Sequence, residues 1–137
     1  MTQAGLSGRL DFVSENVIFK GAYPIGGTDT NALPVMEIGP AVGYYTQVLG
    51  FSVVARDRKS AVLKRDDAQI GLAVNGADPE QASCYFPVSD VEALRRELDA
   101  KGIEPGEIEV QEHEGKRYRV FFAKEPYGVC FCFGQPA

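Results

Sequence analysis

His113 is the one histidine of the chain, and it stands between two glutamates in the polar segment 111–115. An imidazole beside carboxylates can act as a general base, because its ordinary pKa lies near neutral pH. A histidine in a polar turn is more often simply solvated, and both interpretations stay open. A single histidine excludes any metal site that needs two imidazoles from one chain.

Two thiols offer a second kind of chemistry. Cys130 and Cys132 alternate with Phe131 and Phe133, so the period of a strand puts both thiols on one face and both rings on the other. A thiol becomes a nucleophile only where its surroundings favour the thiolate. A free cysteine is more often a small buried hydrophobic residue, and we favour that interpretation here.

Other catalytic and binding motifs are missing from the sequence. It contains no nucleophile elbow, phosphate-binding loop, dinucleotide fingerprint or Cys-x-x-Cys motif. With 14 Lys and Arg against 19 Asp and Glu, the net charge is −5. We therefore expect no binding to nucleic acid, because contacts to phosphates need clustered cations. The negative charge mildly favours a cationic small molecule, since long-range attraction speeds its capture.

The flanks and the cysteine count bear on location. The first residues show no cationic region followed by an apolar run, so we expect no signal peptide. No segment approaches the roughly 18 consecutive apolar residues of a membrane span. Three cysteines, an odd number, fit reduced thiols better than a disulfide framework. These features predict a soluble, cytoplasmic protein with no membrane partner.

A weak internal repeat organises the chain of 137 residues. The segments 34–38 and 87–91 share the pattern Pro, Val, any residue, acid, branched aliphatic. Each leads into a helical pattern that ends at a glycine followed by an apolar residue, at Gly50 and at Gly102. One such unit is too small to bury a sheet face alone, whereas two side by side can do so.

Each half carries one predicted helix. The first begins near Pro40, a residue suited to the first helical turn. Its apolar face consists of Ala41, Tyr44, Tyr45, Val48 and Leu49. The second opens with Ser89 and Glu92, which we expect to form a capping box, and it ends at Gly102.

Short segments with strand character complete both halves. In the first half they are 33–38, 51–56, 60–64 and 69–74; in the second they are 83–88, 108–111, 118–123 and 129–133. Each half thus has the order strand, helix, three strands, which predicts an α+β fold of two βαβββ modules, 32–76 and 82–134. Residues 1–31 lie outside the repeat, and we expect an N-terminal extension or arm there.

Three motifs resemble those of the glyoxalase/bleomycin-resistance/dioxygenase superfamily, the vicinal oxygen chelate fold. They are YYTQVLGF at 44–51, VSDVEAL at 88–94 and EPYG at 125–128, the last an imperfect match. The resemblance covers about residues 33–134 and implies paired βαβββ modules. These would form a curved mixed sheet, with helices on the convex side and a groove on the concave side.

Metal-dependent members of that family take ligands from four equivalent strand positions. Carried over to this sequence, they are Thr30, Ala73, Ser83 and Cys132. Only Cys132 is a strong ligand, whereas oxygen-chelating chemistry needs several O or N donors. We therefore expect no metal and no cofactor.

The family's register also suggests which residues line the groove. It points Tyr118, Val120 and Phe122 into the groove, although plain sheet packing explains these residues equally well. Aromatic rings there would offer a flat ligand stacking or cation–π contacts of about 1 kcal/mol each. Our candidate set for the ligand groove is Tyr118, Val120, Phe122, Cys130, Cys132, Ala73 and Ser83.

The resemblance favours a metal-independent binding protein of the bleomycin-resistance type, which sequesters a cationic or hydrophobic small molecule as a homodimer. No catalytic residue is assigned. One alternative is a metal-dependent lyase, isomerase or dioxygenase of the same fold with displaced ligands. A second alternative is a regulatory binding domain whose groove takes a protein partner.

Overall fold

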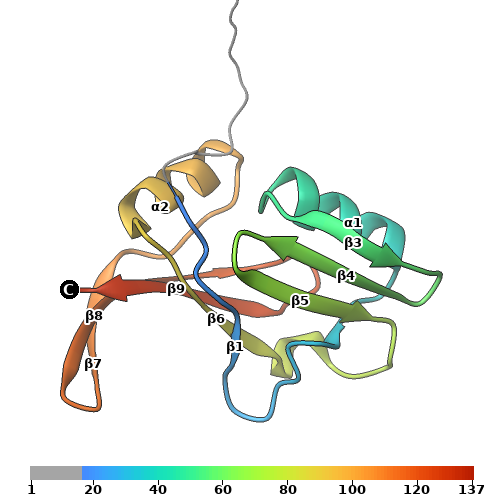
Figure 1. The fold of residues 1–137 in the computed structure, drawn as a ribbon, viewed down its shortest axis with the longest axis horizontal. Helices are drawn as coiled ribbons and strands as arrows, with labels where there is room; N and C mark the ends of the chain where they lie inside the picture. The colour runs from blue at the N-terminus through green and yellow to red at the C-terminus, as the bar shows by residue number, and fades with distance from the viewer. Residues whose placement is uncertain (1–16) are drawn as a thin grey trace, which may run out of the picture.

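The computed structural model describes residues 17–137 as two modules, each with the order strand, helix, three strands (Figure 1). The first module consists of β2 (Leu33–Pro34), α1 (Ile38–Gln47), β3 (Ser52–Arg56), β4 (Ser60–Arg65) and β5 (Ala68–Ala73). The second consists of β6 (Ser83–Pro87), α2 (Val91–Ala100), β7 (Glu109–His113), β8 (Lys116–Lys124) and β9 (Cys130–Pro136). The α+β fold of two βαβββ modules is therefore confirmed.

The two modules form separate mixed sheets with the same internal order. The first sheet runs β2-β5-β4-β3, and the second runs β1-β6-β9-β8-β7. In each module the strand before the helix pairs in parallel with the last strand, and the other pairs are antiparallel. The extra strand β1 (Tyr23–Pro24) lies on the outer edge of β6, and the short 3-10 helix η1 (Pro79–Gln81) precedes β6.

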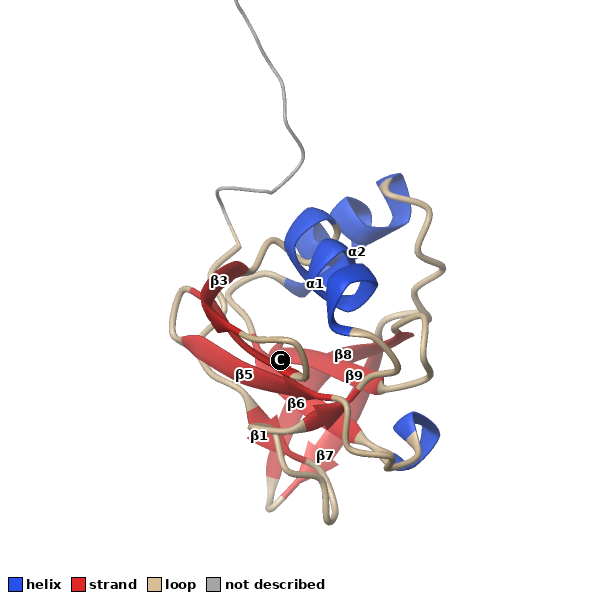
Figure 2. Ribbon diagram, turned by 90° about the vertical axis from the view of Figure 1, so that its right-hand side faces the viewer, coloured by secondary structure: helices blue, strands red, loops and turns tan. Residues whose placement is uncertain are grey.

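Both helices lie on the same side of the molecule (Figure 2). The helix α1 begins at Ile38, two residues before the predicted start, and β2 is correspondingly shorter than the predicted strand 33–38. The cap of α2 also differs from the prediction. Asp90, not Ser89, caps the helix by accepting a hydrogen bond from the Ala93 amide.

Ser89 is drawn into a different contact. Its hydroxyl oxygen accepts a hydrogen bond from the amide of Ile18, 71 residues earlier in the chain. A capping-box pattern describes only the local sequence, so it did not anticipate this competition from a distant amide.

The segment that precedes β1 belongs to the core. Phe19 is fully buried, and its ring packs against Phe51 of the first module and against Phe86 and Phe133 of the second. Phe19 also bridges to Val88, next to the end of β6. The part of the predicted arm that covers residues 1–16 lies outside the described residues. Within 17–137, no helix has the length and apolar character needed to cross a bilayer.

Candidate functional site

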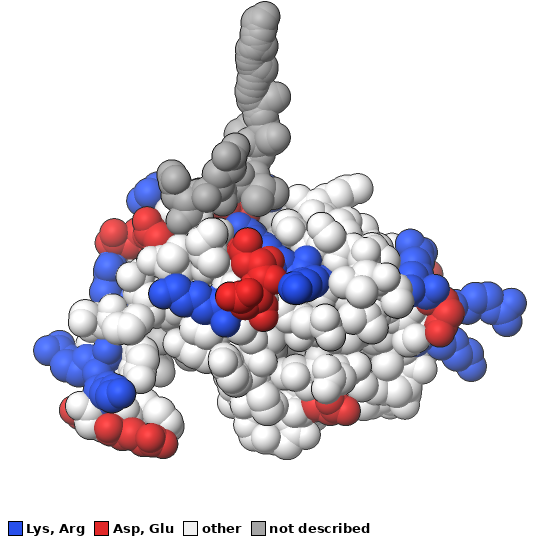
Figure 3. Space-filling model, in the orientation of Figure 1, with Lys and Arg blue, Asp and Glu red and all other residues white. Residues whose placement is uncertain are grey.

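A cavity of about 580 Å³ lies over the open face of the five-stranded sheet. Its lining residues are Tyr23, Pro24, Ile25, Tyr85, Gln111, Glu112, His113, Tyr118, Val120, Phe122 and Cys132. The strands β6, β8 and β9 form its floor, while the segment 23–25 and the end of β7 form its walls. Figure 3 shows this region as a hollow between the β7–β8 hairpin and the chain around β1.

The alternation of side chains along β8 decides which residues face the cavity. Phe121 and Ala123 are buried in the core beneath the sheet, whereas Tyr118, Val120 and Phe122 line the cavity on the opposite face. Phe122 is 37% exposed, and Val120 is only 3% exposed. A strand that packs one face against a core in this way presents every second residue to the other side.

A row of four residues crosses the sheet at the centre of the cavity. Strand register pairs Tyr23 with Tyr85, Tyr85 with Cys132, and Cys132 with Phe122. These four side chains come from β1, β6, β9 and β8, which are adjacent strands of one sheet. The register therefore brings three aromatic rings and one thiol into the same apolar surface, although they span 110 positions of sequence, from 23 to 132.

The lining of the cavity includes one acid, Glu112. Among the described residues that line it, none is Lys or Arg, whereas Glu112 and His113 stand at its wall. Burial raises the pKa of the Cys132 thiol to about 11, with Cys130 and Glu109 nearby adding to the effect. Burial also raises the pKa of Tyr85, which lies close to Cys132 and Tyr118. Both groups are thus neutral at pH 7 and add no charge.

Four of the seven candidate residues meet in this cavity: Tyr118, Val120, Phe122 and Cys132. Cys130 lines a second cavity, which lies next to α1. Ala73 and Ser83 line neither cavity. Ala73 is separated from the others because β5 belongs to the other sheet. Ser83 pairs with Cys130 in register, two residues along the strands from the pair of Tyr85 and Cys132.

Sequence reasoning missed the tyrosines of β1 and β6. Tyr85 carried a usable signal, because it alternates with the buried residues Cys84 and Phe86 and so must face away from the core. Tyr23 carried none, since β1 has only two residues and shows no period. His113, expected in a polar turn, ends β7 opposite Lys116, and its imidazole lies 3.4 Å from the Glu114 carboxylate.

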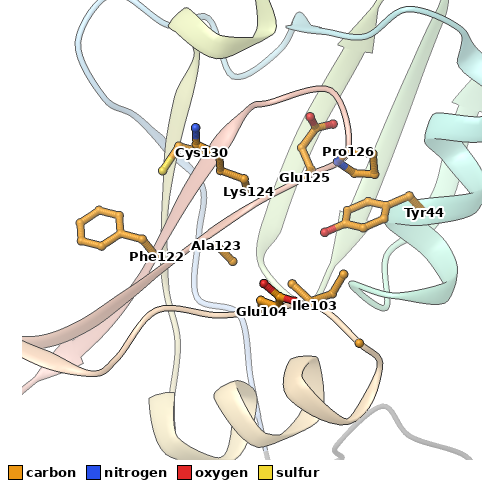
Figure 4. Close-up of a pocket in the computed structure, with 10 residues that line it drawn as sticks. Tyr44, Ile103, Glu104, Phe122, Ala123, Lys124, Glu125, Pro126 and Cys130 are labelled. Atoms are coloured by element: carbon orange, nitrogen blue, oxygen red, sulfur yellow. The ribbon is translucent and has the colours of Figure 1, made fainter.

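The second cavity, of about 550 Å³, lies between α1 and the segment that follows α2 (Figure 4). Tyr44, Ile103 and Glu125 are among its lining residues. The Glu125 carboxylate accepts hydrogen bonds from the amides of Tyr127, at 2.7 Å, and Val129, at 3.0 Å. It also accepts one from the Tyr45 hydroxyl, at 3.4 Å. These bonds engage Glu125 in holding the β8–β9 turn against α1, which is a structural role.

The four positions equivalent to metal ligands do not suit a divalent ion. Thr30 adjoins the first sheet, Ala73 ends β5 of that sheet, and Ser83 and Cys132 lie in the second sheet. Their side chains supply two hydroxyls, one methyl and one protonated thiol, which is a poor donor set for hard cations. In the part of the chain that the structure describes, no group of three or more His, Cys, Asp or Glu residues could hold a metal.

Taken together, the fold and the cavity define a class of small α+β proteins in which two βαβββ modules carry a binding groove. The chain belongs to the Glyoxalase/Bleomycin resistance protein/Dioxygenase superfamily, whose family model matches residues 27–133. A search among curated proteins found no match.

Solved structures of the same fold include two proteins that concern bleomycin. One is the bleomycin-binding protein of bleomycin-producing Streptomyces verticillus, determined with copper(II)-bleomycin. It is 22% identical, with a TM-score of 0.62 over 77% of this chain and 93% of that one. The other is the bleomycin resistance determinant encoded on transposon Tn5, 22% identical, with a TM-score of 0.66 over 81% and 98%.

A third similar structure is a glyoxalase/bleomycin resistance protein/dioxygenase from Alicyclobacillus acidocaldarius. It is 16% identical, with a TM-score of 0.66 over 80% of this chain and 90% of that one. At these identities the likeness establishes the fold and leaves the ligand to be argued from the cavity.

Proposed function

We propose that this protein binds a hydrophobic small molecule that carries a positive charge, without a metal, in the cavity over the five-stranded sheet. The observation that carries the proposal is the row Tyr23, Tyr85, Cys132 and Phe122, with an acid at the cavity wall and, within residues 17–137, no lining Lys or Arg. Sequestration of such a compound, as in bleomycin resistance, is the role that we propose for the binding.

The chemistry of the lining favours a cation over an anion. The face of an aromatic ring attracts a cation, by about 0.5 kcal/mol where it is exposed and about 2 kcal/mol where water is excluded. Glu112 adds a negative charge at the wall, and the whole chain has a net charge of −5. An anionic ligand would find no Lys or Arg among the described lining residues to balance its charge.

The similar structures support a small-molecule ligand. Two of the similar proteins bind bleomycin or confer resistance to it, and both share the two-module fold. The cavity lies on the open face of one module, which is where a groove is expected in this fold class.

The open mouth of the cavity favours a homodimer. Tyr23 is 54% exposed, Ile25 is 40% exposed and Phe122 is 37% exposed, all at one mouth. We propose that a second copy of the chain covers this mouth and completes the binding groove.

The cysteines at 84, 130 and 132 are free, which suits a reducing compartment, and we propose a cytoplasmic location.

The binding proposal is tested by a thermal-shift screen of the purified chain with matched amphiphiles. An aryl-alkyl ammonium, its neutral alcohol and its carboxylate share one hydrophobic group and differ only in charge. We expect the ammonium compound to raise the unfolding temperature most, and the carboxylate least. An equal shift with all three, or no shift with any cation, would count against the proposal.

A further inference from the structure

Two tyrosines of the cavity each lie directly over a glycine. A Cβ atom added to Gly134 of β9 would stand 2.6 Å from the Tyr85 hydroxyl, 2.9 Å from its ring and 3.0 Å from Val120. Real Cβ atoms essentially never show contacts under 3.0 Å, so the Tyr85 ring would have to shift. The ring of Tyr85 therefore occupies the space that a side chain at position 134 would need.

Gly21 has the same relationship to Tyr23. A Cβ atom there would stand 2.8 Å, 3.0 Å and 3.1 Å from three atoms of the Tyr23 ring and hydroxyl. Neither Gly21 nor Gly134 is among the glycines with a positive φ, so backbone conformation does not demand glycine at either position. What both positions require is the absence of a side chain beneath a tyrosine.

These glycines keep two paired tyrosines apart. Tyr23 and Tyr85 are directly opposite each other in the β1–β6 ladder, where side chains ordinarily pack together. Yet within residues 17–137, the ring–ring contacts join only Phe19, Tyr44, Tyr45, Phe51, Phe86, Phe121, Phe131 and Phe133. The Tyr85 ring leans over β9, away from β1, while the Tyr23 ring turns back over its own segment.

We call the part of the cavity above β6, between Tyr23 and Tyr85, the slot. The strands β1 and β9 are two strand spacings apart, or roughly 10 Å. Two aromatic rings at that separation leave room for about one aromatic layer, since stacked ring centroids lie about 4.5 Å or more apart. Tyr118 and Phe122 extend the aromatic surface along the floor, and Glu112 stands at the wall.

We propose that Gly134 and Gly21 are specificity-determining residues, which hold Tyr85 and Tyr23 apart so that the cavity takes a planar aromatic cation. This inference rests on the proposed function, because it concerns the ligand of the same cavity. An alanine at either position forces its tyrosine off the glycine and into the slot. The slot then narrows for a broad planar ligand, while a compact cation at the wall is little affected.

The experiment compares two cationic probes in three variants. The probes are 9-aminoacridine, which is broad and planar, and benzyltrimethylammonium, which is compact. The variants are Gly134→Ala, Gly21→Ala and, as the matched control, Gly27→Ala, where a Cβ atom meets nothing within 4 Å. Affinities are measured by fluorescence titration and calorimetry, with circular dichroism as a check on folding.

We expect the unaltered protein to bind 9-aminoacridine more tightly than benzyltrimethylammonium. Gly134→Ala should weaken the binding of 9-aminoacridine about tenfold or more, which is the usual effect of about one extra methyl group in a fitted pocket. The affinity for benzyltrimethylammonium should change by less than about threefold. Gly21→Ala should act in the same direction, and Gly27→Ala should change neither affinity. Should Gly134→Ala not fold, Gly21→Ala provides the test, since the exposed Tyr23 can shift without disturbing the core.

Three results would contradict the inference. Acridine affinity unchanged in the folded alanine variants would show that the glycines do not set the slot. Tighter binding of the compact cation by the unaltered protein would show that the slot is not built for a planar ligand. Either of these two results leaves the proposed function standing. The third result, in which the unaltered protein binds neither probe, overturns the proposed function as well.

Discussion

The guanidinium carbon of Arg65 lies 4.2 Å from the centre of the Phe19 ring. This contact joins the last residue of β4 to the segment that precedes β1, 46 positions earlier in the chain. Arg65 also donates hydrogen bonds to the carbonyl of Leu49, at 2.8 Å, and to that of Val17, at 3.4 Å. It pairs with Glu97 of α2 at 3.4 Å. One buried cation thus connects both modules with the segment leading to the wall of the cavity.

Arg65→Ala should destabilise the protein strongly. The side chains of Arg65 and Glu97 are 5% and 2% exposed, so removal of the arginine leaves a carboxylate buried beside a weaker partner, Lys101, at 3.7 Å. Breaking a buried pair in this way costs about 3–5 kcal/mol. Urea unfolding measures the loss, with Arg96→Ala on the exposed face of α2 as control. A loss no larger than that of the control would show that the pair does not stabilise the fold.

Glu125→Gln should remove one pH-dependent part of the stability. Burial raises the pKa of Glu125 above its ordinary 4.5, against the opposing effect of the hydrogen bonds from Val129 and Tyr127. The folded state therefore holds this proton at a higher pH than the unfolded chain does. The stabilisation from protonation is complete below the pKa that Glu125 has in the unfolded chain. It is lost as pH rises through the pKa that Glu125 has in the folded protein.

The measurement is the free energy of unfolding of both proteins between about pH 4 and 7. The free energy of unfolding of the unaltered protein, relative to that of Glu125→Gln, should fall as pH rises across this range. Glu104→Gln, an exposed glutamate that lines the same cavity, should show no such trend. A constant or growing advantage would contradict the raised pKa.

Replacement of Tyr118 should distinguish the contribution of its aromatic ring to ligand affinity from that of its apolar volume. Tyr118→Phe keeps the aromatic face toward the cavity, whereas Tyr118→Leu keeps only apolar volume. If the ring attracts a cation, the leucine variant should lose about three- to thirtyfold in affinity for 9-aminoacridine, and the phenylalanine variant should lose little. Val110→Ala, on β7 and 51% exposed, serves as the control outside the cavity. Equal losses in both Tyr118 variants would mean that the hydroxyl, not the ring, contacts the ligand.

The purified protein should carry no stoichiometric divalent metal. The donors at Thr30, Ser83 and Cys132 are two hydroxyls and a thiol whose pKa is raised to about 11, so a hard cation finds no suitable charge there. Elemental analysis after purification without chelators should find less than one ion per chain. A stoichiometric metal whose removal lowers the unfolding temperature would instead support the metal-dependent alternative.

The proposed dimer predicts a solution mass of twice 14.9 kDa. A charge at the mouth of the cavity, as in Ile25→Glu, should shift the protein toward monomer, because the buried charge has no partner in the interface. Met36→Glu, at a more exposed apolar residue (64%), should leave the mass unchanged. Size-exclusion chromatography with light scattering measures both. A monomeric unaltered protein at micromolar concentration would exclude the dimer as the working form.

The sequence by itself determined the two-module plan and which residues share one face of β8 in the cavity floor. Local periods suffice for this, because alternation along 118–123 separates Phe121 from Val120 and Phe122 without knowledge of the partner strands. The repeat around Gly50 and Gly102 likewise marks both helix ends, since a glycine that takes up a positive φ closes a helix in any tertiary context.

Only the tertiary structure decided what surrounds that floor. The pairing of Tyr23 with Tyr85, the glycine beneath each ring and the buried Arg65 all depend on contacts between residues far apart in sequence. No period or spacing encodes such contacts, because they follow from how two sheets and an N-terminal segment share one core. For the same reason Ser89 failed as the predicted helix cap, its hydroxyl being taken by the amide of Ile18.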